Sequence, residues 1–250
     1  MLLWRIWFFL HAVVTFFILY PFFFILLRSK KWFKYVFVIK CKWARLLLFN
    51  SGIKYQFICK QKLDPKKTYV FCPNHTSYLD IILSYIVIKH YFHFMGKAEL
   101  LKVPFFNIFF KRMNIAVNRK SVVASHKAFL RASRDLDQGV SIAIFPEGTI
   151  PDCAPDIGRM KNGAFKLAIE KQIDIVPIVY LDNWHLIPDK KGTVYFGKPG
   201  TARVCVLDPI STLGMTTNDI SQLRNAVQEK MQTCIDEYLT PQNRNLLFNY

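Results

Sequence analysis

The stretch "YVFCPNHTSYLD", residues 69–80, joins a short apolar run to a polar turn and the start of a helical pattern. The apolar run at 68–73 predicts a buried strand. Two interpretations of the turn compete. In the first, Ser77 and Asp80 form a capping pair for the following helix. In the second, Asp80 accepts the Nδ1 proton of His75, which leaves Nε2 free to take a proton from a substrate hydroxyl. The spacing alone does not decide between them.

Strands and helices alternate on both sides of this turn. Short apolar runs predict strands at 68–73, 92–96, 114–118, 141–146, 174–180, 193–197 and 202–207. Helical patterns occur at 79–89, 121–137, 160–171 and 218–239, the last with Asn218 or Asp219 as a candidate cap. This alternation predicts an α/β domain with a mostly parallel mixed sheet flanked by helices. Active sites of such sheets lie in the loops beyond the carboxyl ends of the strands.

Two further polar groups are expected in those loops. In "IAIFPEGTIPD", residues 142–152, a strand ends in a turn that displays Glu147, and Gly148 permits close approach of a ligand to the backbone. Arg119 directly follows the strand at 114–118, where a guanidinium can grip a phosphate.

The first fifty residues differ in composition from the rest. Residues 6–27 form an apolar run long enough to cross a hydrocarbon core, and the basic cluster "RSKK" at 28–31 is typical of the cytoplasmic side. The segment at 32–49 mixes aromatic residues with lysines, among them Lys40, whose side chains we expect to reach toward lipid headgroups. We therefore predict a membrane anchor at 1–50 and an α/β domain at 51–250. A helical hairpin packed on the domain, or one kinked at Pro21 and inserted only halfway, remains an alternative.

Composition favours a partner that is both apolar and anionic. The chain carries a formal charge of +17 together with 52% hydrophobic residues. A membrane surface suits both properties, whereas nucleic acid suits only the charge. The six cysteines show neither a CxxC pair nor zinc-type spacing with histidine, which indicates reduced thiols in a cytosol-facing protein.

Four blocks of the sequence resemble, in order, those of the glycerolipid acyltransferases, specifically the 1-acyl-sn-glycerol-3-phosphate (lysophosphatidate) acyltransferase family. The blocks are "NHTSYLD", "KAELLKVPFF…NIAVNR", "FPEGT" and "IVPIVY", and the resemblance covers residues 70–180. It implies transfer of a fatty acyl group from a thioester, on acyl carrier protein or coenzyme A, to the sn-2 hydroxyl of lysophosphatidate. The product would be phosphatidate, made at the cytoplasmic face of the cell membrane. The resemblance also implies that no covalent acyl-enzyme, cofactor or metal is needed.

The resemblance assigns roles to individual residues. His75 would be the general base and Asp80 the residue that orients it. Arg119 matches the arginine that binds the acceptor's phosphate. The remaining residues matched to substrate binding are Asn74, Glu147, Gly148, Thr149 and Lys161.

Departures from the family pattern leave the acceptor open. Ile150 stands where the third block usually has an arginine, although Arg159 or Lys161 could supply that charge. Asn107 and Met113 occupy the approximate positions of two usual glycines. Another lysolipid or an acylated amino acid is therefore an alternative acceptor. A basic membrane-binding scaffold without catalysis is a more remote alternative, and no recognised nucleic-acid-binding motif is present.

Overall fold

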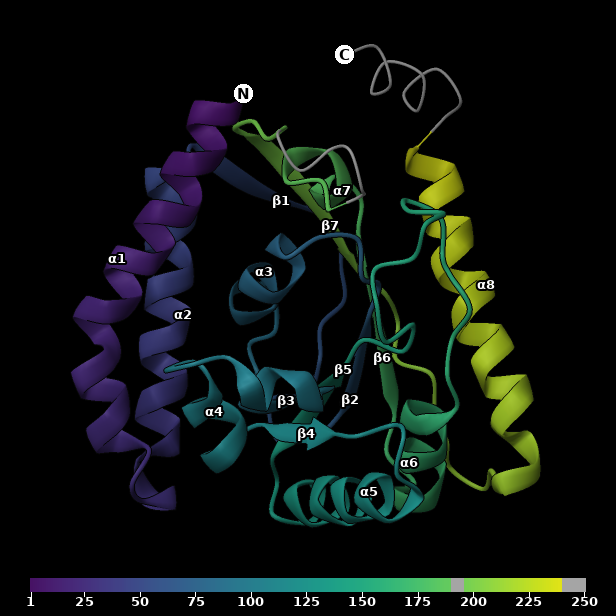
Figure 1. The fold of residues 1–250 in the computed structure, drawn as a ribbon. Coiled ribbons are helices and arrows are strands. Elements are labelled where there is room, and N and C mark those ends of the chain that lie inside the picture. Colours follow the sequence, from purple (N-terminus) through teal and green to yellow (C-terminus); the bar gives the residue numbers. More distant parts are fainter. Residues whose placement is uncertain (190–195, 240–250) are drawn as a thin grey trace.

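A seven-stranded mixed sheet forms the centre of the molecule and carries helices on both faces (Figure 1). The computed structural model describes residues 1–189 and 196–239. The strand order across the sheet is β1-β7-β6-β2-β5-β3-β4. The strands are β1 (Ile53–Lys60), β2 (Val70–Pro73), β3 (Phe92–Lys97), β4 (Ile115–Val117), β5 (Ser141–Ile144), β6 (Ile175–Tyr180) and β7 (Gly200–Val206).

Most of the sheet is parallel. Strands β6, β2, β5, β3 and β4 all run in the same direction. Strand β7 is antiparallel to β6, and β1 is parallel to β7. The predicted α/β class with a mostly parallel mixed sheet is thus confirmed. The five parallel strands bring their carboxyl ends to one edge, where the turn after β2 lies.

Helices cover the sheet in two layers. On one face lie α1 (Leu2–Leu26), α2 (Phe33–Asn50), α3 (Leu79–Val87) and α4 (Asn107–Arg112). On the other lie α5 (Val122–Asp137), α6 (Gly163–Lys171) and α8 (Ile220–Tyr238). Shorter elements are α7 (Asn183–Leu186) and the 3-10 turns η1 (Lys30–Trp32), η2 (Ala98–Lys102) and η3 (Thr217–Asp219).

This double cover explains the uninterrupted apolar strands. In β2, Phe71 packs into the core beneath α1 to α4, whereas Val70 and Cys72 pack beneath the helices of the opposite face. Successive side chains of a strand point to opposite faces, so a strand covered on both sides has to be apolar throughout.

The predicted elements match most of the observed ones, with differences at the ends. The strand predicted at 193–197 falls largely outside the described residues, and Phe196 and Gly197 are not part of a strand. Strand β1 and the short helices α4 and α7 were not predicted. Asp219, one of the two predicted caps, is the N-cap residue of α8, and its side chain forms a capping box with Thr216 around η3.

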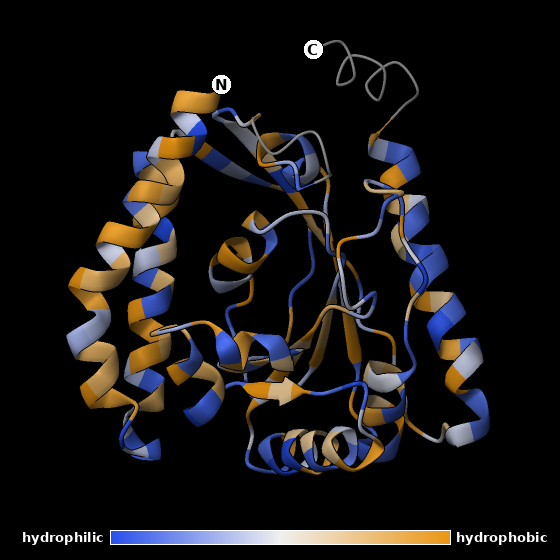
Figure 2. Cartoon of the chain, viewed as in Figure 1, coloured by the Kyte–Doolittle hydropathy of each residue, from blue (hydrophilic) through white to orange (hydrophobic). Residues whose placement is uncertain are grey.

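Helices α1 and α2 form an antiparallel hairpin along one side of the domain (Figure 1). Trp4 Nε1 donates to the Ser51 carbonyl at 2.9 Å, and Trp43 Nε1 donates to Thr15 Oγ1 at 2.8 Å. Near the other end of α1, Phe23 is fully buried. Figure 2 shows α1 as apolar along most of its length, and among the described helices it has the length and composition to cross a membrane. That residues 1–50 form a separate anchor stays a prediction.

One predicted lipid contact in α2 is wrong. Lys40 points into the core, with 5% of its surface exposed, rather than toward lipid headgroups. Its Nζ lies 3.3 Å from the Tyr85 hydroxyl and 4.0 Å from the centre of the Phe109 ring. Burial lowers the pKa of Lys40 to about 7. The neighbouring Lys34, Lys42 and Arg45 are exposed, as expected.

Candidate active site

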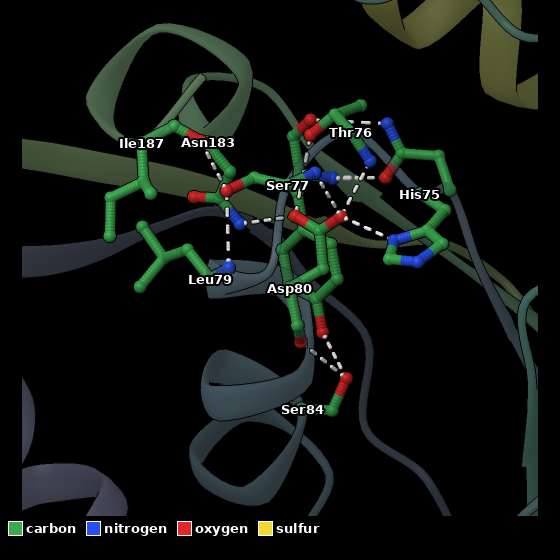
Figure 3. A network of polar contacts seen from close by, with 10 residues as sticks. His75, Thr76, Ser77, Leu79, Asp80, Ser84, Asn183 and Ile187 are labelled. Carbon is green, nitrogen blue, oxygen red and sulfur yellow. Dashed lines mark hydrogen bonds and ion pairs between the residues drawn. The ribbon is translucent and has the colours of Figure 1, made fainter. Parts of the chain in front are cut away.

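His75 and Asp80 meet at the carboxyl end of β2 (Figure 3). Asp80 lies in the first turn of α3, and its Oδ2 is 3.0 Å from His75 Nδ1. Because a carboxylate accepts this hydrogen bond, the imidazole carries its proton on Nδ1. Its Nε2 then has a free lone pair, and no described residue bonds to it. This is the arrangement expected of a general base and the residue that orients it.

The Asp80 carboxylate is held by the turn that precedes it as well as by His75. Its Oδ2 accepts from the backbone N–H groups of Thr76 and Ser77, at 2.5 and 2.8 Å. Its Oδ1 accepts from the Thr76 hydroxyl at 3.3 Å. The two interpretations of this turn therefore hold together: Asp80 ties the start of α3 to the turn and orients His75 at the same time.

A further donor to Asp80 comes from a distant part of the chain. Asn183, at the start of α7, is fully buried and donates from Nδ2 to Asp80 Oδ1 at 2.7 Å (Figure 3). Asn183 was not predicted as a site residue. Its position after a predicted strand was the available indication: the residue follows β6, which lies beside β2 in the sheet, and residues after neighbouring parallel strands meet at one edge.

The imidazole of His75 packs against aromatic side chains. Its ring stacks on Phe145 with 4.2 Å between ring centres, and Phe145 in turn stacks on Phe94 at 5.8 Å. The side chain is 15% exposed, so one edge of the ring is open to a substrate. Stacking and the bond to Asp80 together fix the ring orientation.

Glu147 lies buried beside this pair, at 4% exposure. Burial raises the pKa of Glu147 to about 8, and the charge of Asp80 adds to the shift. The backbone N–H groups of His75 and Gly158 face the carboxyl and offset part of the shift, although neither forms a hydrogen bond with it. At neutral pH, Glu147 is therefore mostly protonated and can donate a hydrogen bond.

Gly148 and Arg119 form a close contact that requires glycine. Gly148 has a φ of +74°, and its carbonyl accepts from Arg119 Nη1 at 2.9 Å. A Cβ at residue 148 would collide with the Arg119 guanidinium. Gly148, in the "FPEGT" block, thus positions Arg119, the last residue of the "NIAVNR" block.

Arg119 is one of three cations that lie together here, with Lys97 and Lys161. Lys97, at the end of β3, donates to Thr149 Oγ1 at 3.2 Å. The pKa of Lys161 is lowered, first by loss of solvent and then by the positive charges of Arg119 and Lys97. Lys97 was not predicted, although its place at the carboxyl end of a predicted strand was the available signal. Mutually repelling cations that face one space suit a phosphate ligand.

A hollow of about 560 Å³ opens next to these residues. It is lined by Glu147, Thr149, Pro151, Arg159, Met160, Lys161, Asn162 and Arg224. Both cations that sequence reasoning offered in place of the missing arginine at Ile150 therefore lie at this hollow. Arg224, from α8, adds a third and donates to Asn162 Oδ1 at 2.8 Å.

Asn74 is placed differently from the other predicted site residues. It is fully buried, its Nδ2 donates to the Tyr180 carbonyl at 3.1 Å, and its Oδ1 accepts from Tyr180 N–H at 2.7 Å. A buried amide with these partners is suited to joining the ends of β2 and β6. Contact of Asn74 with a substrate stays a prediction, as do the substrate contacts of Arg119, Glu147, Gly148, Thr149 and Lys161.

The chain is similar to known proteins over most of its length. A family model described as Acyltransferase matches residues 54–181. The 1-acyl-sn-glycerol-3-phosphate acyltransferase alpha of Mus musculus is 31% identical over 80% of this chain and 71% of its own. The beta form from Homo sapiens is 30% identical over 76% of this chain and 68% of its own. The crystal structure of the 1-acyl-sn-glycerophosphate (LPA) acyltransferase PlsC from Thermotoga maritima superposes with a TM-score of 0.77, at 22% identity and 96% coverage of both chains.

Proposed function

This chain belongs to the acyltransferase family, and from that membership we propose that it acylates lysophosphatidate at its free sn-2 hydroxyl. The observation that carries the proposal is the His75–Asp80 pair beside a cluster of cations. The pair supplies a base for a hydroxyl, and the cations supply a place for the acceptor's phosphate. The relatives from Mus musculus and Homo sapiens are named for this acceptor.

The proposed reaction needs one base and two aligned substrates. Nε2 of His75 takes the proton of the sn-2 hydroxyl while the hydroxyl oxygen attacks the carbonyl carbon of an acyl thioester. The carbon–sulfur bond then breaks, and the imidazolium returns the proton to the departing thiolate. The products are phosphatidate and a free thiol. Asp80 stabilises the imidazolium that forms between the two steps.

Acceptor binding is assigned to the residues around Gly148. Arg119, Lys97 and Lys161 would hold the phosphate, with the Glu147 carboxyl as a hydrogen-bond donor at neutral pH. Fixing the phosphate would bring the hydroxyl to His75 and convert an encounter of two substrates into an oriented one. The thioester donor, on acyl carrier protein or on coenzyme A, is part of the proposal, and so is a reaction that needs neither cofactor nor metal.

The proposal also covers where the protein acts in the cell. The exposed apolar side chains of α1, together with Arg28, Lys30 and Lys31 in the turn that follows, favour attachment to a membrane with the catalytic domain on its cytoplasmic face.

The test uses detergent-purified protein, a labelled acyl thioester on each of the two carriers, and a panel of lysolipids. We expect transfer to lysophosphatidate, reduced by roughly two to four orders of magnitude in His75→Ala. His126→Ala is the matched control, since His126 is exposed on α5 and outside the site.

The other outcomes lead to different conclusions. Transfer only to another lysolipid or to an acylated amino acid would keep the chemistry and replace the acceptor, which the isoleucine at residue 150 would then explain. Absence of transfer to every acceptor, in a folded protein, would support a non-catalytic membrane-binding role.

A further inference from the structure

A second hollow, of about 500 Å³, lies at the opposite end of the parallel strands from His75. Its rim carries six lysines: Lys34, Lys60, Lys62, Lys66, Lys67 and Lys89. We call this the lysine groove. Its floor is apolar and includes Phe71 of β2 and Val206 of β7.

The charges of the lysine groove are not compensated within the described part of the chain. None of its six lysines forms an ion pair there, and no aspartate or glutamate lines the hollow. Lys89 shows the resulting repulsion, since burial and then the charges of Arg45 and Lys60 lower its pKa. A concave group of like charges concentrates anions from solution, and an anionic ligand would relieve the repulsion.

The position of the lysine groove separates it from the acyl-transfer site. Lys66 and Lys67 precede β2, and Lys89 precedes β3, so these residues lie at the amino ends of the strands. His75 follows the carboxyl end of β2. The ligand of the groove therefore has no need to reach the reacting atoms, which argues against a donor thioester as its occupant.

Continuity with α2 indicates what the occupant is. Lys34 belongs both to the lysine groove and to the first turn of α2, close in sequence to the basic residues Lys30 and Lys31. On the same helix, Tyr35 and Val38 are exposed apolar residues. The groove thus opens beside a surface suited to lipid. A lysine rim above an apolar floor matches a molecule with a phosphate and an apolar body.

We propose that the lysine groove binds the phosphate-bearing headgroup of an anionic phospholipid in the membrane on which the α1–α2 hairpin rests. The groove acts as a second membrane contact, distinct from the apolar face of α1. It orients the domain on the bilayer and makes attachment depend on the content of anionic lipid. The inference does not depend on the proposed reaction.

The test compares binding of the full-length protein to phosphatidylcholine vesicles with and without phosphatidylglycerol. The groove variant carries Lys62→Gln, Lys66→Gln and Lys67→Gln, and leaves α1 and α2 unchanged. The control variant carries Lys54→Gln, Lys127→Gln and Lys166→Gln, three exposed lysines outside the groove. Both variants have the same net charge, so a difference between them reports position rather than total charge.

We expect the groove variant to lose roughly tenfold to hundredfold in its preference for anionic vesicles, because each lysine near an anionic surface contributes on the order of a fivefold factor. The preference should also fall with added salt. The control variant should lose much less. Activity of both variants on detergent-dispersed substrates should match the wild type, which keeps this test separate from that of the proposed function.

Three outcomes would overturn the proposal. An equal loss of preference for anionic vesicles in the two variants would show that net charge, and not the position of the lysines, determines binding. Competition by free inorganic phosphate as strong as by vesicles would assign the groove to a soluble anion. A raised KM for the donor thioester in the groove variant alone, measured in detergent, would make the groove a donor-docking surface.

Discussion

Gly148 combines two constraints at a single residue, a positive φ and the contact with Arg119. Replacement by alanine is expected to destabilise the fold by about 1–2 kcal/mol through the left-handed backbone. It should also displace the Arg119 guanidinium and raise the KM for lysophosphatidate about tenfold, the effect of one lost charge-assisted hydrogen bond. Urea unfolding and initial rates measure the two effects separately.

Gly139 provides the matched control for this prediction. It has a φ of +77°, close to that of Gly148, but a Cβ there would meet nothing within 4 Å. Gly139→Ala should therefore show the same loss of stability with an unchanged KM. A raised KM in both variants would show that general destabilisation, and not Arg119, accounts for the effect.

The raised pKa of Glu147 predicts that the stability of the protein depends on pH. Its folded-state pKa of about 8 lies above the ordinary value of 4.5, so the folded protein binds more protons than the unfolded chain between these values. The free energy of unfolding then falls as pH rises from about 4.5 to 8, and by pH 7 the loss is roughly 3 kcal/mol. Glu147→Gln should remove this slope and stabilise the protein at neutral pH.

Urea unfolding at a series of pH values checks the effect of Glu147. Glu229→Gln, at an exposed glutamate of α8, is the control and should leave the slope as in the wild type. An unchanged slope in Glu147→Gln would mean that the carboxyl is ionised and paired in solution.

At the scale of single residues, the contact between neighbours in the sequence could be predicted, and the contact made by a distant residue could not. His75 and Asp80 are five residues apart, and the turn between them is enough to bring them together. Asn183 reaches Asp80 only because β6 lies beside β2. That adjacency is a property of the sheet, which the spacing of residues along the chain does not contain.

Helix α1 is connected to the candidate active site through residues that follow α7. Arg5 is buried, and its Nη1 donates to the carbonyls of Pro188 and Phe196, at 2.7 Å each. The adjacent Ile187 carbonyl accepts from Ser77 Oγ at 2.7 Å, and Ser77 N–H binds Asp80. The hairpin therefore supports the segment that contacts the turn holding His75 and Asp80.

Arg5→Ala should loosen this support while leaving the rest of the fold in place. Each charged hydrogen bond is worth roughly 1.5–3 kcal/mol, so hydrogen-exchange protection of the α7 amides is expected to fall by tenfold or more. Arg28→Ala, near the other end of α1, is the control, since Arg28 is exposed and lies over the Phe24 ring of α1. Equal protection in the two variants would show that Arg5 does not hold the segment.

Among the strands, those with uninterrupted apolar runs were predicted, and the edge strand β1 was missed. The apolar runs of β2, β5 and β6 stand out because both of their faces are buried. Strand β1, "IKYQFICK", lies at the sheet edge and keeps lysines and a glutamine exposed. Its alternation of Ile53, Tyr55 and Phe57 with polar residues was the available signal. Helix α4 has only six residues, too few for a helical period to be recognised.

The attachment of α1 at both ends predicts how the molecule meets a membrane. A helix of 25 residues is roughly 37 Å long and could span a bilayer. Yet Arg5 and Trp4 bind the domain near one end, and Phe23 and Leu27 are buried near the other. Spanning would require one end to leave the domain. We expect α1 to lie in a single leaflet, with both of its ends on the same side.

Labelling of sealed vesicles tests this topology. One variant carries a cysteine added ahead of Met1 and another carries Lys31→Cys, each with the exposed Cys153 replaced by serine. A membrane-impermeant maleimide should label both variants from the same side. Labelling of only one of them would establish a spanning helix.

The pairing of β1 with β7 determines when the protein can complete its fold during synthesis. Strand β1 lies at the sheet edge and, among the described strands, pairs only with β7, whose residues leave the ribosome after most of the chain has been made. The apolar hairpin just ahead of β1 emerges first. Nascent chains would thus reach the bilayer with an unpaired strand edge, and such an edge invites aggregation until its partner arrives. Early capture of α1 and α2 by lipid would keep the unfinished sheets of neighbouring chains apart during that interval.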